Sequence, residues 1–277
     1  MIDVHDVTVE LPGRRAPVLD RVSFRLAPGE RVALLGGNGS GKTTLGRLLN
    51  GTQLPTRGRV LVQGYDTRDP EARFEVRRRV GVLFQDPDDQ FVTTTVEREI
   101  AFGLENLGMP TLSMRQAVAA AIRDFGLRGQ EAVPPHEMSG GEKARLALAC
   151  VWVMGPRTLV LDETDALLDW TGSERLLQRI ADLPPETAVL RITTDADTAA
   201  SSPRVLVLHA GRLVADGAPD AVFASLPPEV GERVGMPLVW EVAQELIRAG
   251  RLHRPTVSLQ TVLVALGCPE LPPGGAA

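Results

Sequence analysis

The chain has 277 residues, of which 43% are hydrophobic and 23% charged, so a large domain with a smaller appendage and a sizeable core is expected. A formal net charge of −5 argues against a surface that attracts nucleic acid or anionic lipid as a whole. The cysteines, Cys150 and Cys268, lie far apart and outside metal-ligand spacing, which favours a reducing compartment such as the cytosol.

The sequence carries no signal for secretion or membrane insertion. The opening residues, MIDVHDVTVE, have neither a basic start nor an apolar run. The longest apolar stretch, residues 146–155, is about half of the roughly 20 residues that a membrane-spanning helix needs. If this protein acts at a membrane, we expect another chain to hold it there.

Short apolar runs alternate with helical ones along the chain. The runs are rich in Val, Leu and Ile, as strands buried on both faces are, and they read ERVALLG, GRVLVQG, VGVLFQD, TLVLDE and AVLRITT. This pattern predicts an α/β sheet. Between about residues 86 and 155 the pattern becomes helical, which predicts a helical subdomain inserted in the sheet.

Two helices of this subdomain show capping signals. Ser113 with Gln116, and Ser139 with Glu142, each have the spacing of a capping box, in which the two side chains satisfy the first backbone N–H groups. The second helix is expected to end at Gly155-Pro156.

The C-terminal third is predicted to contain a hairpin and a small helical appendage. Residues 205–217 indicate a hairpin that turns at Ala210-Gly211. Proline-rich segments then precede a helix from Pro237 to Gly250. We therefore expect the appendage to span residues 219–277, with a disordered PPGGAA tail.

The strongest chemical signal is GGNGSGKTT at residues 36–44, between the strand RVALL and the helical run TTLGRLLN. Its glycines let backbone N–H groups and a helix N-terminus face phosphate oxygens, which a merely flexible turn in this context would not require. Lys42 is expected to bridge the β- and γ-phosphates, and the Thr43 hydroxyl to bind Mg²⁺. The predicted ATP-binding residues of this loop are Gly36, Asn38, Gly39, Ser40, Gly41, Lys42, Thr43 and Thr44.

A phosphate loop of this type needs carboxylates at a neighbouring strand end, and TLVLDE supplies them. Asp162 is the predicted Mg²⁺ ligand, and Glu163 is the predicted catalytic residue that polarises the attacking water. Gln85, at the end of VGVLFQ, is a candidate contact to both the metal and the water. Taken alone, each segment also fits a solvated turn; the phosphate loop upstream favours the functional interpretation.

The segment MSGGEKARLALA, residues 138–149, has two interpretations. Ser139 and Glu142 account for it as an ordinary helix start. Alternatively, a helix N-terminus that carries a serine and the exposed glycines Gly140 and Gly141 forms a second anion site.

The order GGNGSGKTT, Gln85, SGGEK, LVLDE resembles the ATP-binding cassette (ABC) ATPases, over residues 1 to about 218. The resemblance implies a P-loop cassette with a mostly parallel core sheet and antiparallel N-terminal strands. In that family two cassettes close head to tail, so Ser139, Gly140 and Gly141 would contact the nucleotide of the partner. Glu142 stands where the family usually has glutamine.

A closer resemblance is to the ATPases of energy-coupling factor (ECF) and cobalt-type importers. It rests on residues 84–110 and on the C-terminal segment 235–267, which in those proteins helps to hold the cassette dimer together. It implies a peripheral protein at the cytoplasmic face of the membrane, bound to a scaffold subunit and a substrate-binding membrane subunit that import vitamins or transition-metal ions. The acidic cluster Asp86, Asp88, Asp89 would then pair with a membrane subunit, or equally form a solvated loop.

Three departures from the family pattern lie near the expected catalytic site. Thr194 occupies the position of the switch histidine that reaches the γ-phosphate, and it carries no proton relay near neutral pH. The segment 164–170 keeps Asp169 but adds Asp165 and Trp170, and Leu11 stands where an aromatic residue would stack on adenine.

These departures lead to a hypothesis of an asymmetric pair of cassettes. The site on this chain binds ATP and hydrolyses it slowly, while its SGG segment completes an efficient site on a different cassette. A homodimer in which Glu163 suffices is the less favoured alternative, and a regulatory cassette that does not hydrolyse ATP is another. A soluble ABC ATPase of DNA repair or translation would need a coiled-coil insertion or a second cassette, and this sequence has neither.

Overall fold

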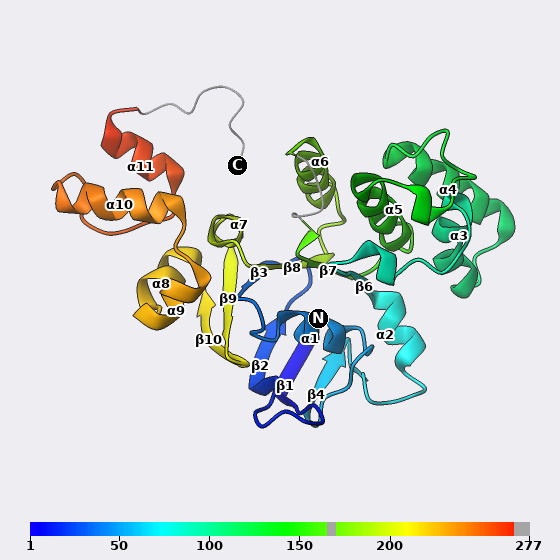
Figure 1. The fold of residues 1–277 in the computed structure, drawn as a ribbon, viewed down its shortest axis with the longest axis horizontal. Helices are drawn as coiled ribbons and strands as arrows, with labels where there is room; N and C mark the ends of the chain where they lie inside the picture. Colours follow the sequence, from blue (N-terminus) through cyan, green and yellow to red (C-terminus); the bar gives the residue numbers. More distant parts are fainter. Residues whose placement is uncertain (165–169, 269–277) are drawn as a thin grey trace.

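The computed structural model describes residues 1–164 and 170–268, with the side chains of residues 170–175 left out of the description. The predicted loop 164–170 therefore lies mostly outside the described residues, as does the PPGGAA tail. Figure 1 shows two sheets in the middle of the molecule and a group of helices at either end. In the described part of the chain, none of the helices is both long and apolar enough to cross a bilayer.

The core sheet has six strands in the order β10-β9-β3-β8-β7-β6. All neighbours pair in parallel except β10, which pairs antiparallel with β9. The strands are β3 (Arg31–Leu35), β6 (Val80–Leu83), β7 (Thr158–Asp162), β8 (Ala188–Thr193), β9 (Arg204–His209) and β10 (Arg212–Gly217). The predicted hairpin is confirmed, and its turn residues Ala210 and Gly211 both have positive φ angles.

A second, antiparallel sheet has four strands in the order β2-β1-β4-β5. These are β1 (Ile2–Val9), β2 (Leu19–Leu26), β4 (Arg57–Val62) and β5 (Tyr65–Asp66). The prediction that GRVLVQG is a strand buried on both faces is wrong, because this segment is β4 of the antiparallel sheet. Val60 and Val62 are buried while Leu61 between them is partly exposed, so only one face of β4 packs on the core.

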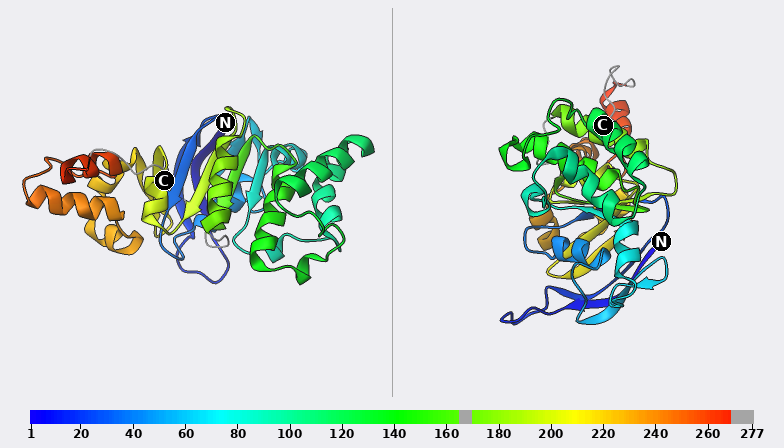
Figure 2. Two further views of the ribbon diagram at one scale, coloured as in Figure 1. Left: turned by 90° about the horizontal axis from the view of Figure 1, so that it is seen from above. Right: turned by 90° about the vertical axis from the view of Figure 1, so that its right-hand side faces the viewer.

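Helices α3 to α5 gather at one end of the core sheet and α8 to α11 at the other, as Figures 1 and 2 show. The first group is α3 (Val96–Asn106), α4 (Thr111–Asp124) and α5 (Gly140–Trp152), with the short 3-10 helices η1 (Pro87–Asp89) and η2 (Pro135–Glu137). The second group is α8 (Pro219–Ser225), α9 (Pro228–Val234), α10 (Leu238–Arg248) and α11 (Leu259–Leu266). The remaining helices are α1 (Lys42–Leu49), α2 (Arg73–Arg79), α6 (Trp170–Ala181) and α7 (Ala196–Ala200).

One of the two predicted helix starts is wrong. Helix α4 begins at Thr111, directly after Pro110, so Ser113 lies inside the first turn and caps nothing. Proline sets its own φ and is favoured at a helix entrance, which places the start before the serine. In α5 the capping box of Ser139 and Glu142 is present, although the helix ends at Trp152, earlier than Gly155-Pro156.

The C-terminal helices do not all stand apart from the cassette. Val222, Phe223, Val230 and Val234 of α8 and α9 share a hydrophobic cluster with Ala33, Leu35, Val205 and Val207 of the core sheet. Trp240 of α10 belongs to the same cluster, and α10 and α11 also share a small second cluster around Ala243, Leu246 and Val262. The boundary at residue 219 stays a prediction, since α8 and α9 pack on the sheet as its own helices do.

Candidate active site

The ends of three parallel strands position the candidate site. The carboxyl ends of β3, β8 and β7 meet at one edge of the core sheet, because parallel strands run in the same direction. Gly36 N–H donates to the Thr193 carbonyl over 3.4 Å, and Glu163 N–H donates to the Ile192 carbonyl over 2.9 Å. The exposed Thr194 therefore follows a strand that lies between the phosphate loop and the acidic pair.

The phosphate loop is held tightly against the connection between β1 and β2. A Cβ on Gly41 would lie 2.8 Å from the carbonyl oxygen of Val18 and 2.8 Å from Cδ2 of Leu19, and the φ angle of Gly41 is 106°. Only glycine fits this position without moving the backbone. Helix α1 begins at the next residue, so its free N–H groups open toward the loop.

Lys42, Glu163 and Gln85 form a connected polar chain. The Lys42 side chain is 5% exposed, and its Nζ donates to the carbonyls of Gly36 (2.8 Å) and Gly37 (3.2 Å). Lys42 Nζ also lies 3.3 Å from Glu163 Oε1, and Gln85 Nε2 donates to Glu163 Oε2 over 2.8 Å. These contacts join residues that are far apart in the sequence.

The backbone of Glu163 is strained. Its φ angle is 52°, in the left-handed region that costs a residue with a Cβ about 1 kcal/mol or more. Strain of this kind persists only where the surroundings fix it, and here the bonds from Gln85 and Lys42 fix the carboxylate. The arrangement aims a carboxylate at the mouth of the phosphate loop.

Asp162 has the features of a metal ligand. It is 1% exposed, and burial raises the pKa of its carboxyl group, partly offset by a hydrogen bond with the Thr43 side chain. Among the described residues, its Oδ1 is a buried acceptor without a hydrogen-bond partner. A hydroxyl, a carboxylate and the nearby Gln85 amide are the hard oxygen donors that Mg²⁺ prefers, so the side chains present fit this ion.

A cavity of about 240 Å³ collects most of the predicted residues. Its lining is Leu11, Arg14, Val18, Asn38, Gly39, Gly41, Lys42, Thr43, Thr44, Gln85 and Glu163. Of the predicted loop residues, Gly36 and Ser40 lie beneath the surface instead. Sequence reasoning missed Arg14 and Val18, which lie in the connection between β1 and β2, two strands before the phosphate loop.

The glycine-rich start of α5 is not part of this cavity. Ser139 and Gly140 are exposed, and a Cβ on Gly140 would meet no atom within 4 Å. The Glu142 carboxylate accepts hydrogen bonds from Ser139 N–H (2.8 Å), from Ser139 Oγ and from Gln130, which lower its pKa. The Glu142 carboxylate is therefore hydrogen-bonded to its own helix start and to Gln130. The space beside Gly140 stays open.

Two carboxylates of the acidic cluster after Gln85 form contacts within the chain. Asp86 accepts a hydrogen bond from Asp88 N–H over 3.0 Å, and the Asp88 carboxylate pairs with Lys143 Nζ at 2.8 Å. Lys143 stands one residue after Glu142 in α5. The pair thus links the segment after Gln85 to the glycine-rich helix start.

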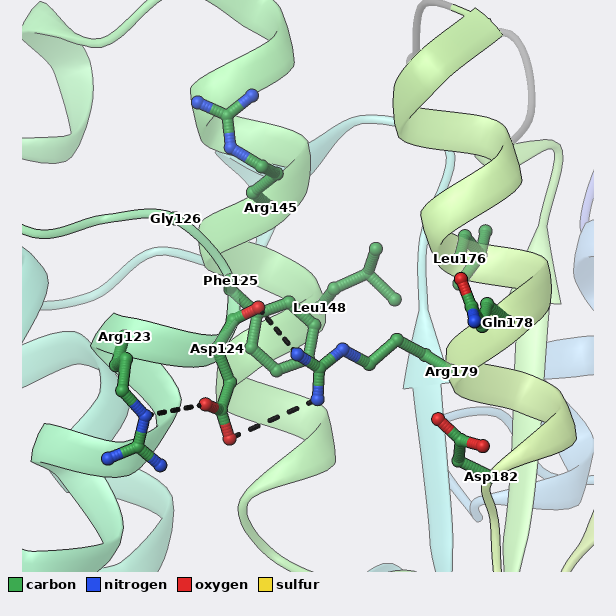
Figure 3. Close-up of a pocket in the computed structure, with 10 residues that line it drawn as sticks. All are labelled: Arg123, Asp124, Phe125, Gly126, Arg145, Leu148, Leu176, Gln178, Arg179 and Asp182. Carbon is green, nitrogen blue, oxygen red and sulfur yellow. Dashed lines mark hydrogen bonds and ion pairs between the residues drawn. The ribbon is translucent and has the colours of Figure 1, made fainter.

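A larger cavity of about 440 Å³ lies between α6, the C-terminal end of α4 and the middle of α5 (Figure 3). It contains none of the phosphate-loop residues. Arg179 of α6 crosses toward α4, where it donates to the Asp124 carbonyl oxygen over 2.7 Å and lies 5.2 Å from the centre of the Phe125 ring. This contact joins α6 to the helical group.

Arg179→Ala should lower the free energy of unfolding by about 1–2 kcal/mol, because it removes a hydrogen bond and a cation–π contact between two helices. Arg123→Ala is the matched control: Arg123 bonds the same aspartate, yet it is 54% exposed, so we expect a loss below about 0.5 kcal/mol. Urea unfolding of both variants measures the difference. Equal effects would show that Arg179 does not join the helices.

A phosphate loop between a strand and a helix, facing an acidic pair at the end of a neighbouring parallel strand, defines a P-loop nucleotide-binding protein. The chain belongs to the ABC transporter family, whose profile matches residues 19–166. The predicted family and the predicted cassette fold are confirmed. The protein is an ATP-binding subunit of a membrane transporter, with the ATPase activity of its family.

Two curated relatives illustrate the similarity. The energy-coupling factor transporter ATP-binding protein EcfA1 of Bacillus licheniformis is 39% identical over 236 residues, which cover 84% of this chain and 84% of the relative. The cobalt import ATP-binding protein CbiO of Syntrophus aciditrophicus is 39% identical over 249 residues, which cover 88% and 89%.

Solved structures agree with these relatives. The cbiO1 protein of Clostridium perfringens, described as part of the ABC transporter complex cbiONQ, has a TM-score of 0.70 and 31% identity, over 90% of this chain and 96% of that chain. A dimeric ATP-binding cassette bound to ADP and Pi has a TM-score of 0.72 at 22% identity, over 79% and 99%, a likeness that shows the fold alone.

Proposed function

We propose that this chain powers an importer of the ECF type that takes up a vitamin or a transition-metal ion. In this proposal it is a peripheral protein at the cytoplasmic face of the membrane, bound to a scaffold subunit and a substrate-binding membrane subunit. The names of the relatives, EcfA1 and CbiO, support this assignment. The connected group Lys42–Glu163–Gln85 at the mouth of the phosphate loop is the observation that carries the ATPase part.

The proposed chemistry follows from the contacts of these side chains. The N–H groups of residues 36–44 and Lys42 bind the phosphates. Phosphate oxygens compete with Glu163 for Lys42, which leaves the Glu163 carboxylate free to polarise a water molecule. Gln85 keeps that carboxylate oriented through its hydrogen bond. Thr43, Asp162 and Gln85 would hold Mg²⁺, which supplies positive charge to the phosphates.

A second, different cassette is the proposed dimer partner, favoured over a second copy of this chain. Support comes from Thr194, an exposed neutral residue that directly follows β8, the strand whose last carbonyls bond Gly36 and Glu163. The space beside Gly140 is open, and no atom of the described chain fills it. This open space supports a role of Ser139, Gly140 and Gly141 toward the partner's nucleotide. A helix N-terminus left open in this way attracts phosphate.

Gly140→Ala tests this interface. The chain itself has room for the added methyl group, so folding and ATP binding by this chain should be unchanged. ATP hydrolysis by the assembled pair of cassettes should fall by at least about tenfold, because the methyl group pushes the partner's phosphates out of hydrogen-bond range. Gly217→Ala, where a Cβ makes only an ordinary 3.7 Å contact, is the control and should hydrolyse ATP normally. Normal turnover in both variants would remove Gly140 from the interface.

The proposed function is tested by measuring Mg·ATP binding and hydrolysis by the purified chain over a range of protein concentrations. Tight binding with negligible turnover, which rises when a second cassette and the membrane subunits are added, is the expected result. Brisk turnover per chain that increases with concentration would contradict the asymmetric pair and support a homodimer. Failure to bind ATP at all would contradict the proposal as a whole.

A further inference from the structure

Helix α1 carries a second basic residue besides the lysine of the phosphate loop. Lys42 is its first residue, and Arg47 lies in its last turn. The helix approaches the core sheet closely at the residue before Arg47: a Cβ on Gly46 would lie 3.1 Å from Cδ1 of Ile192 in β8 and 3.6 Å from Cγ1 of Val160 in β7. The backbone of Arg47 is therefore fixed relative to two strands that end at the candidate site.

The side chain of Arg47 contacts an aromatic ring. Its guanidinium carbon lies 5.5 Å from the centre of the Phe84 ring, a distance at which the π electrons of the ring attract the cation. Among the described residues, Arg47 forms no ion pair with a carboxylate. Phe84 directly follows β6 and is partly buried against the core cluster. The ring is thus held by the core on one side and by the arginine of α1 on another.

The residue after Phe84 is Gln85, whose amide bonds the candidate catalytic carboxylate. Gln85 is exposed, and its Nε2 donates to Glu163 Oε2 over 2.8 Å. An exposed side chain has little packing of its own, so its place depends on the backbone that carries it. The anchored neighbour, Phe84, fixes that backbone. A shift of the ring would move the Gln85 amide relative to Glu163.

We infer that Arg47 is a positioning residue for ATP hydrolysis: its guanidinium holds the Phe84 ring, and the ring holds Gln85 where it orients the Glu163 carboxylate. This inference rests on the ATPase part of the proposed function. Arg47 is not part of the lining of the nucleotide cavity. Its loss should therefore slow hydrolysis and leave ATP binding unchanged, because a small misplacement of a catalytic group affects the reaction more than the bound state.

The test measures single-turnover hydrolysis of bound Mg·ATP and, separately, the affinity for Mg·ATP. Arg47→Ala should slow hydrolysis by about 3- to 5-fold, the effect expected of one cation–π contact at an exposed position. Its affinity should change by less than about twofold, since an exposed charge outside the cavity contributes little to binding. Arg47→Lys keeps a cation that reaches the ring and should restore most of the rate. An unchanged rate in Arg47→Ala, or a parallel loss of affinity, would overturn the inference.

A second variant separates the ring contact from a simple effect of charge. Burial raises the pKa of the Asp162 carboxyl group, and the charge of Arg47 is the smallest of the effects that lower it, after those of Thr43 and Lys42. Phe84→Leu keeps every charge and an apolar side chain but removes the ring, so it should slow hydrolysis as much as Arg47→Ala does. A normal rate in Phe84→Leu would assign the effect to charge and overturn the positioning role.

Arg77→Ala is the matched control. Arg77 is also exposed and also lies in the last turn of a helix, α2, and it has no ring contact among the described residues. Its rate and affinity should be those of the unmodified chain. Urea unfolding checks that all variants remain folded. Equal slowing by Arg77→Ala and Arg47→Ala would show a general effect of losing a cation at a helix end, and would count against the inference.

Gln85→Ala distinguishes failure of this inference from failure of the proposed function. This variant should be slow, and adding Arg47→Ala to it should cost nothing more, because both act through the same amide. A further loss in the double variant would show that Arg47 acts by another route. A slow Gln85→Ala beside a normal Arg47→Ala would overturn the inference alone, whereas a normal Gln85→Ala would overturn the role of Gln85 in the proposed function and the inference with it.

Discussion

Thr194→His should raise ATP hydrolysis at this chain's own site by about 10²-fold or more, because a positioned acid–base group typically contributes about 10²–10⁴-fold. The residue directly follows β8, whose last carbonyl groups accept hydrogen bonds from Gly36 and Glu163, so its backbone lies at the strand end between the phosphate loop and Glu163. Threonine is neutral and short. A histidine there titrates near neutral pH and reaches further.

Single-turnover hydrolysis measures this gain without the contribution of a partner site. Thr194→Asn is the matched control: it is polar and uncharged, and it should stay as slow as the unmodified chain. The double variant Thr194→His with Glu163→Gln should lose the gain, because the histidine acts on a water that Glu163 orients. No increase in the Thr194→His chain would mean that Thr194 does not limit turnover, and that Glu163 suffices.

Lys42→Ala should weaken ATP binding by about 10²–10⁴-fold, since each charge-assisted hydrogen bond to phosphate contributes about 1.5–3 kcal/mol and Lys42 is expected to contact two phosphates. The loss has a second cause. Without Lys42, the Glu163 carboxylate loses the ammonium group that lies 3.3 Å from it and that would separate its charge from the phosphates. Isothermal titration with Mg·ATP measures the affinity directly.

Lys143→Ala is the matched control, because Lys143 is the only other lysine in the sequence. Its partner is Asp88 at 2.8 Å, outside the cavity, so ATP affinity should change by less than about twofold. Circular dichroism checks that both variants fold, which matters because Lys42 also donates hydrogen bonds to the carbonyls of Gly36 and Gly37. Unchanged ATP binding by folded Lys42→Ala would remove the phosphate loop from the proposed function.

The features that the sequence predicted well are those whose determinants lie close together along the chain. The phosphate loop is one contiguous segment, and the strand before it and the helix after it appear in the same few residues. The capping box of Ser139 and Glu142 is equally local, three residues apart. Where a neighbouring proline competed, as at Pro110, the same kind of reasoning placed the helix start incorrectly.

Tertiary structure decided the rest. The placement of GRVLVQG in the antiparallel sheet depends on what packs on each face, and a short apolar segment does not encode that. The bond of Gln85 to Glu163 spans 78 residues, and that of Asp88 to Lys143 spans 55. Arg14 lines the cavity beside the phosphate loop although β2 and β3 separate it from the loop in the sequence. The sequence by itself determined the kind of chemistry, because phosphate binding needs a local motif; which remote side chains complete the site was decided by packing, since only the folded chain brings them into contact.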